Sequence, residues 1–142
     1  MKAFFITIGA SALLLLGLVA LSGSTQSPAA TESSDIVSTR GLHWHPQLTI
    51  YVKGEKVDIP QNVGLGAVHQ PMHTHEDLPL IHLEFPSVVR KQDLTLGQFF
   101  KIWGKDMRSF GTDMKMMVNG KENTEFENYR MSDGDKIELR YE

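Results

Sequence analysis

Residues 48 to 60 read LTIYVKGEKVDIP, and this stretch predicts the first two strands of a sheet. Its apolar residues recur at every second position, which is the period of a strand with one buried face. They are Leu48, Ile50, Val52, Val57 and Ile59. Residues 53 to 56, KGEK, interrupt the alternation as a turn does, and Pro60 ends it. We therefore expect a β-hairpin that places one face in the core.

All six histidines of the chain lie near this hairpin in the sequence. They are His43 and His45 upstream, and His69, His73, His75 and His82 downstream. Imidazole nitrogen is a good ligand for copper, zinc, nickel and iron, and a usable site needs three or four such groups together. The clustering makes transition-metal binding the first hypothesis.

The spacing of these histidines indicates which of them share a side of the chain. In an extended chain, the side chains at positions i and i+2 point the same way. His43 with His45, His73 with His75, and His82 with Glu84 form three such pairs. The predicted metal ligands are therefore His43, His45, His73, His75, His82 and Glu84. Glu76 and His69, together with Glu84, are expected to orient ligating imidazoles or to substitute for them.

The absence of cysteine limits the possible metal ligands, and the charge of the chain limits the possible binding partners. Without cysteine there are no disulfides, thiolate zinc sites, iron–sulfur clusters or blue-copper centres. Copper is the first prediction for the metal, because a nitrogen site without thiolate suits Cu(II), and zinc is the second. A formal net charge of −3 provides no electrostatic footprint for nucleic acid.

The strand pattern also predicts where the histidine pairs point. If the first strand extends backward, the upstream pair faces away from the core, although Pro46 favours an edge or a bulge at that point. In residues 80 to 85, apolar side chains alternate with His82 and Glu84. This strand should place the polar pair on the metal side and its apolar residues in the core.

Residues 95 to 104 predict the main helix. Thr95 followed by Gln98 matches a capping box, and Gly104 supplies the stop. The apolar face consists of Leu96, Phe99, Phe100 and Trp103. Residues 114 to 118 and 136 to 141 then read as strands, and Asn119-Gly120 is a hairpin turn signal. A hairpin, a third strand, one helix and closing strands indicate an α+β fold.

Two resemblances extend this interpretation. Val118-Asn119-Gly120-Lys121 and residues 131 to 139, MSDGDKIEL, resemble the closing half of β-grasp (ubiquitin-like) domains. That resemblance implies a β-grasp-like mixed sheet with one main helix, in which residues 61 to 86 are a histidine-rich insertion. The motifs HWHP, HTH, IHLE and LGQFFxxWG are similar to those of a family of small, uncharacterised, extracytoplasmic microbial domains, which implies export.

The N-terminal region should not belong to the folded domain. Residues 1 to 22 combine a basic start with an uncharged apolar run close to the roughly 20 residues that span a bilayer. We expect a hydrophobic helix there, either a cleaved signal peptide or an uncleaved anchor that binds the membrane. Residues 23 to 40 are predicted to be a flexible linker, and residues 41 to 142 the extracytoplasmic metal-binding domain.

Three function classes follow from the sequence. The first is a metal-binding module with a multi-histidine site. The second is a metal-dependent enzyme with three histidines and an open position for water. His73-Thr74-His75 resembles the start of a cupin motif, but Pro79 and Leu80 stand where its glutamate is expected. The third is a β-grasp-type interaction module with histidines that bind no metal.

Overall fold

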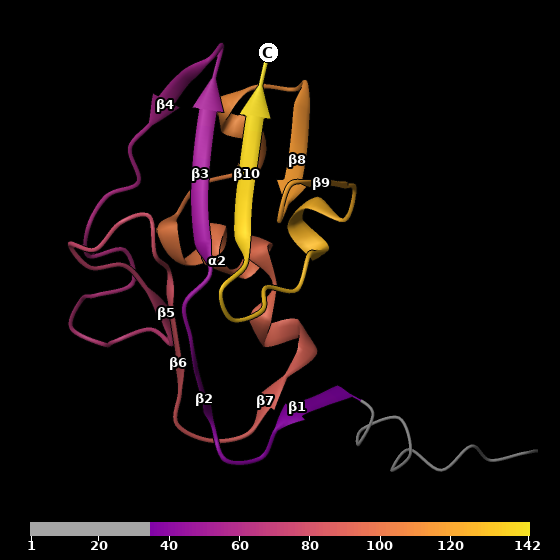
Figure 1. Ribbon diagram of the computed structural model, residues 1–142. Coiled ribbons are helices and arrows are strands. Elements are labelled where there is room, and N and C mark those ends of the chain that lie inside the picture. Colours follow the sequence, from indigo (N-terminus) through magenta and orange to yellow (C-terminus); the bar gives the residue numbers. More distant parts are fainter. Residues whose placement is uncertain (1–34) are drawn as a thin grey trace, which may run out of the picture.

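The computed structural model of the chain describes residues 35 to 142 (Figure 1). This part is α+β, with one α-helix and three sheets. The strands are β1 Ile36–Ser38, β2 Leu42–Trp44, β3 Gln47–Val52, β4 Glu55–Val57, β5 Met72–His73, β6 His82–Phe85, β7 Val89–Arg90, β8 Met114–Val118, β9 Lys121–Asn123 and β10 Lys136–Tyr141. The helix is α2, Leu96–Trp103, and the 3-10 helices are η1 Lys91–Leu94, η2 Met107–Phe110 and η3 Phe126–Asn128.

The predicted N-terminal features fall mainly outside these residues. The hydrophobic helix, the signal peptide or anchor, and residues 23 to 34 of the linker all lie outside the described range. Within residues 35 to 142, no helix has the length and apolar character needed to cross a bilayer. At the end of the predicted linker, Ile36–Ser38 forms β1 and pairs with β7, so ordered structure begins before residue 41. Ile36 and Val37 are β-branched, which favours a strand.

The largest sheet has the strand order β4-β3-β10-β8-β9. Its two central strands, β3 and β10, are parallel, with Leu48 opposite Ile137 and Ile50 opposite Leu139. The other pairs in this sheet are antiparallel. Both hairpins close with two left-handed residues, Lys53-Gly54 and Asn119-Gly120, as two-residue turns of a twisted hairpin require. The hairpin predicted from residues 48 to 59 is confirmed as β3 and β4.

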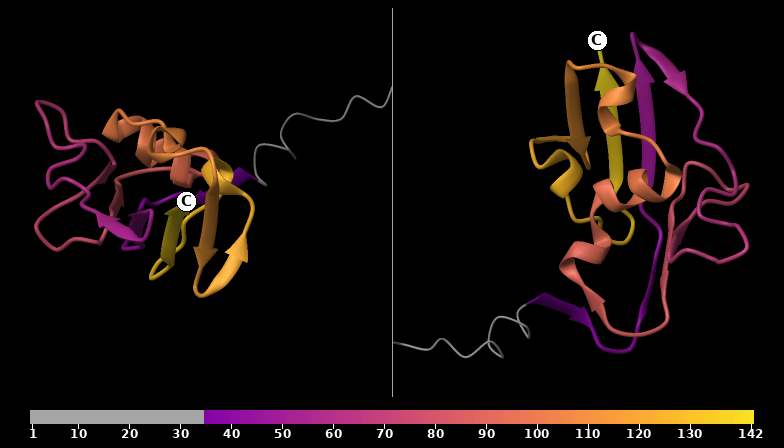
Figure 2. Two further views of the ribbon diagram at one scale, coloured as in Figure 1. Left: turned by 90° about the horizontal axis from the view of Figure 1, so that it is seen from above. Right: turned by 180° about the vertical axis from the view of Figure 1, so that it is seen from behind.

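Helix α2 lies across one face of this sheet, as both views in Figure 2 show. Its residues Leu96, Phe99 and Phe100 are buried, as are the inward residues of β3 and β10. The Thr95 hydroxyl accepts a hydrogen bond of 3.3 Å from the Gln98 N–H, and Gly104 ends the helix with φ of 73°. The predicted N-cap and the predicted stop are both confirmed.

A second, three-stranded sheet with the order β2-β6-β5 carries His43, His82 and His73 on its strands. The chain leaves β2 before His45-Pro46 and starts β3 in the other sheet, so the first strand does not extend backward as one element. Pro46 explains the break, since it has no N–H to donate to a ladder. The antiparallel register of β6 with its two neighbours then decides which side chains meet.

Candidate metal site

Five histidines form two groups that share one member. His43, His45 and His82 are the outer trio, and His73, His75 and His82 are the inner trio. Within each trio, the candidate ligand atoms all lie within 4.8 Å of one another. These two trios are groups that could hold a metal ion, so the five predicted histidine ligands do come together in space.

The strand register explains how residues far apart in the sequence meet. His43 pairs with Glu84 between β2 and β6, and His73 pairs with His82 between β5 and β6. Directly paired residues lie on the same face of a sheet. The opposite face carries Met72 and Leu83, both fully buried in the core. The expectation that His82 and Glu84 share a face opposite Leu83 is therefore confirmed.

His73 and His75, the inner pair, are anchored by Thr74, the residue between them. Thr74 is fully buried, and its hydroxyl donates to the Pro60 carbonyl at 2.8 Å and accepts from the Val63 N–H at 3.0 Å. Its backbone also bonds to the same loop, through Thr74 N–H to Val63 O and Asn62 N–H to Thr74 O. These bonds hold His73 and His75 in place from the side opposite the site.

Hydrogen bonds determine which nitrogen of two imidazoles is free to bind a metal. His73 Nδ1 lies 3.1 Å from the Gln70 carbonyl, and His82 Nε2 lies 3.0 and 3.1 Å from the two Asp77 carboxylate oxygens. Carbonyl and carboxylate oxygens only accept, so these nitrogens carry the protons. The lone pairs are left on His73 Nε2 and His82 Nδ1. An imidazole that donates its other N–H to a carboxylate or carbonyl is the usual arrangement of a metal ligand.

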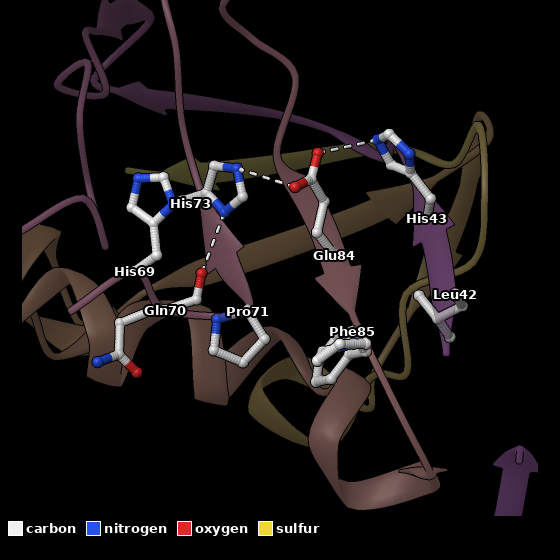
Figure 3. Close-up of a pocket in the computed structure, with 9 residues that line it drawn as sticks. Leu42, His43, His69, Gln70, Pro71, His73, Glu84 and Phe85 are labelled. Atoms are coloured by element: carbon white, nitrogen blue, oxygen red, sulfur yellow. Dashed lines mark hydrogen bonds and ion pairs between the residues drawn. The ribbon is translucent and has the colours of Figure 1, made fainter. Parts of the chain in front are cut away.

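Glu84 lies between His43 of the outer trio and His73 of the inner trio (Figure 3). One carboxylate oxygen is 3.0 Å from His43 Nε2 and 4.0 Å from His82 Nδ1, and the other is 3.9 Å from His73 Nε2. His73 Nε2 and His82 Nδ1, the two nitrogens that keep a lone pair, therefore both lie within 4.0 Å of this carboxylate. Glu84 belongs to neither trio, but from its position it could bind an ion that lies between them.

The other two predicted residues are more peripheral. The His69 ring stacks on His73 with 5.6 Å between centroids and belongs to neither trio. Glu76 is exposed, and among residues 35 to 142 no ion pair joins it to a histidine. The thioether of Met72 is also excluded from the site, because Met72 lies in the core on the other face of β5.

Burial and hydrogen bonding adjust two ionisation equilibria. Desolvation lowers the pKa of His73, whose side chain is 3% exposed, against smaller raising effects of the Gln70 hydrogen bond and the Glu84 charge. A lowered pKa keeps this imidazole neutral, which is the form that binds metal. The hydrogen bond from His82 lowers the pKa of Asp77, so Asp77 remains a carboxylate acceptor.

The distances between the ligand nitrogens of each trio are close to those found around a bound ion. An ion at the centre of a triangle with sides of 4.8 Å would lie roughly 2.8 Å from each atom, whereas a zinc–nitrogen bond is about 2.0 to 2.1 Å long. Each nitrogen would have to move inward by roughly 0.7 Å, which is within reach of a small rotation of an imidazole about its side-chain bonds.

Sequence reasoning missed two residues that orient this cluster. Asp77 bonds His82 across the turn that leads into β6, and Asp133 accepts the backbone N–H of His45 at 2.8 Å. The second contact joins residues 88 positions apart, so it depends on the fold and leaves no local signal. Asp77 had a weak signal, because it is an acidic residue two positions after His75 and five before His82.

A hollow of about 600 Å³ opens beside Glu84. Its polar lining comes from His43, His69, Gln70, His73 and Glu84, and its apolar lining from Leu42, Pro71, Phe85 and Pro86. Figure 3 shows Glu84 between His73 and His43 at this hollow. It reaches one histidine of each trio, His43 of the outer and His73 of the inner one.

The fold and the site together define an α+β domain with a histidine cluster that could hold a metal ion. No protein-family model matches the chain, and no curated protein or solved structure is significantly similar to it.

Proposed function

We propose that this domain binds one transition-metal ion through its histidine cluster, outside the cytoplasm. The observation that carries this proposal is the pair of histidine trios, each with its ligand atoms within 4.8 Å, that share His82. Two of the five imidazoles also have their second nitrogen bonded to an acceptor, as ligating imidazoles require. Solvated histidines without a metal have no need of this orientation.

Copper is the first candidate for the ion and zinc is the second. The available ligands are imidazole nitrogens and a carboxylate, and Cu(II) binds such sets most tightly among the divalent ions. Three nitrogens with one open position also suit zinc. Cu(I) is less favoured, since the nearby Met72 sulfur faces the core.

The location and the fold family are part of the proposal. Residues 1 to 22 have the composition of a signal peptide or a membrane anchor, and the histidine motifs resemble those of extracytoplasmic domains. The β-grasp resemblance is supported by the strand order β4-β3-β10-β8-β9. In this sheet the first strand, β3, pairs with the last strand, β10, and the hairpins β3-β4 and β8-β9 form its two sides. The histidine-bearing sheet β2-β6-β5 is then an addition to that fold.

One observation favours a second candidate, a metal-dependent enzyme. The hollow beside Glu84 could admit a small substrate to an ion in either trio, and Glu84 could act as a general base there. An enzyme would show turnover that depends on added metal, whereas a binding domain would show affinity alone.

The decisive experiment measures metal in the full chain, purified without a polyhistidine tag and without added metal. Elemental analysis should find about one copper or zinc ion per chain, and added Cu(II) or Zn(II) should raise the melting temperature by mass action. His69→Ala is the matched control, because His69 belongs to neither trio. No bound metal, together with an unchanged melting temperature in both ions, would refute the proposal.

A further inference from the structure

The arrangement of the cluster suggests more than storage of an ion. Resting on the proposed function, we infer that the ion has two alternative positions that share His82, and that it is loaded and released through the outer trio and held by the inner one. The domain would then act as a metal carrier that exchanges its ion with other ligands, with no change of oxidation state.

The two trios differ in exposure and in anchoring. The side chain of His43 in the outer trio is 60% exposed, whereas that of His73 in the inner trio is 3% exposed. The inner pair is fixed by the buried Thr74 and by the Gln70 carbonyl. In the outer pair, His43 and His45, the residue between the two histidines is Trp44, which is only partly buried. An ion in solution therefore meets the outer trio first, and the inner trio is the more preorganised of the two.

His82 belongs to both trios, so an ion need not lose all its ligands when it moves between them. Transfer inward breaks the bonds to His43 and His45 and forms bonds to His73 and His75, while the bond to His82 is kept. The ion retains its charge, and no electron is transferred. Because a shared ligand excludes occupation of both positions by independent ions, the expected stoichiometry is one ion per chain.

Glu84 is placed to assist this step. Its carboxylate lies near one histidine of the outer trio, one of the inner trio and the shared one, at 3.0, 3.9 and 4.0 Å. A carboxylate oxygen is a common ligand for zinc and can occupy the coordination position left empty during the exchange. Glu84 is also half exposed and lines the hollow, where a competing ligand from solution can approach the ion.

The test follows the transfer of Zn(II), which has no redox chemistry, from the loaded full chain to a chromogenic chelator. The outer variant His43→Ala/His45→Ala should keep its equilibrium affinity within about tenfold of the original chain, but release zinc to the chelator at least about tenfold more slowly. The inner variant His73→Ala/His75→Ala should lose more than about a hundredfold in affinity, since perturbing even the residues behind a ligand costs about 10 to 100-fold. Glu84→Gln should slow release, and Glu76→Gln is the matched control that should not.

Each result either supports two alternative ion positions or overturns them. Equal losses of affinity in the outer and inner variants would mean one five-histidine site and overturn the inference. So would two zinc ions bound at once, or an unchanged release rate in the outer variant. If the inner double variant fails to fold, His75→Ala replaces it, because His75 is only partly buried. A chain with all histidines present that binds no zinc or copper would refute the proposed function itself, which is a separate result.

Discussion

Thr74→Val is the substitution that best tests how the fold holds the inner trio. The two side chains have nearly the same shape, so the change removes the hydrogen bonds of a hydroxyl without opening a cavity. That hydroxyl makes two hydrogen bonds, one to the Pro60 carbonyl and one from the Val63 N–H. Thr74 itself is fully buried.

The two lost bonds do not cost the same. Pro60 is exposed, so its carbonyl can turn to water, whereas Val63 is buried with 7% exposure and its N–H is left without a partner. A buried donor without a partner costs about 1 to 3 kcal/mol. We therefore expect the free energy of unfolding of the metal-free protein to fall by about 2 kcal/mol, most of it from the Val63 N–H.

The assay is urea unfolding of the metal-free chain, combined with a calorimetric titration of Zn(II). Because His73 and His75 flank Thr74, zinc affinity should also fall, by about tenfold if roughly 1.4 kcal/mol of preorganisation is lost. Thr49→Val is the control: Thr49 lies on the other sheet, and its substitution should change stability by less than about 0.5 kcal/mol. A loss below about 0.5 kcal/mol for Thr74→Val would refute the reasoning that this residue anchors the inner pair.

Four further predictions concern the site and its surroundings. His75→Ala should lower metal affinity by more than about tenfold, whereas His69→Ala should have a smaller effect, and calorimetry that ranks them in reverse would contradict the trio assignment. Asp77→Asn should weaken metal binding by about 10 to 100-fold through loss of the carboxylate that orients His82, with little effect on urea unfolding because Asp77 is exposed. Thr95→Ala should lower the free energy of unfolding by about 1 kcal/mol through loss of the helix cap and leave metal affinity unchanged; a large fall in affinity would connect the helix to the site. Affinity should fall steeply from about pH 7 to about pH 5, since an unperturbed imidazole has a pKa of about 6.5 and protons compete with the ion. The lowered pKa of His73 means that this ligand stays neutral to a lower pH than an unperturbed imidazole does. Calorimetry in buffers of different ionisation enthalpy should count more than about one proton per ion released, and a smaller count would contradict a multi-histidine site.

Local patterns predicted much of this structure because they act over a few residues. The alternation in residues 48 to 59 was enough to predict the β3 and β4 hairpin, and Asn119-Gly120 was enough for the turn between β8 and β9. The i, i+2 spacing of His82 and Glu84 correctly placed them opposite Leu83, because successive residues of a strand face opposite sides.

Long-range pairing could not be predicted in the same way. That His73 lies opposite His82, and His43 opposite Glu84, depends on the register of three strands brought together from separate parts of the chain. The sequence contains the pairs but not the register, so it could not show that His82 belongs to both trios. The same holds for Asp133, which reaches the backbone of His45 only because the turn before β10 packs there.

The three same-face pairs are built in the same way, and this explains both why the cluster is ordered and why its two trios differ. Each pair flanks a single residue on the opposite face: Trp44, Thr74 or Leu83. Thr74 and Leu83 are fully buried, so the inner trio rests on side chains that cannot move without disturbing the core. Trp44 is only partly buried, so the outer pair is held less firmly. A ligand that is loosely held can follow an ion out to a competing ligand, and one held by the core cannot. The gradient in burial behind the histidines is thus the physical reason to expect release from the outer trio and retention in the inner one.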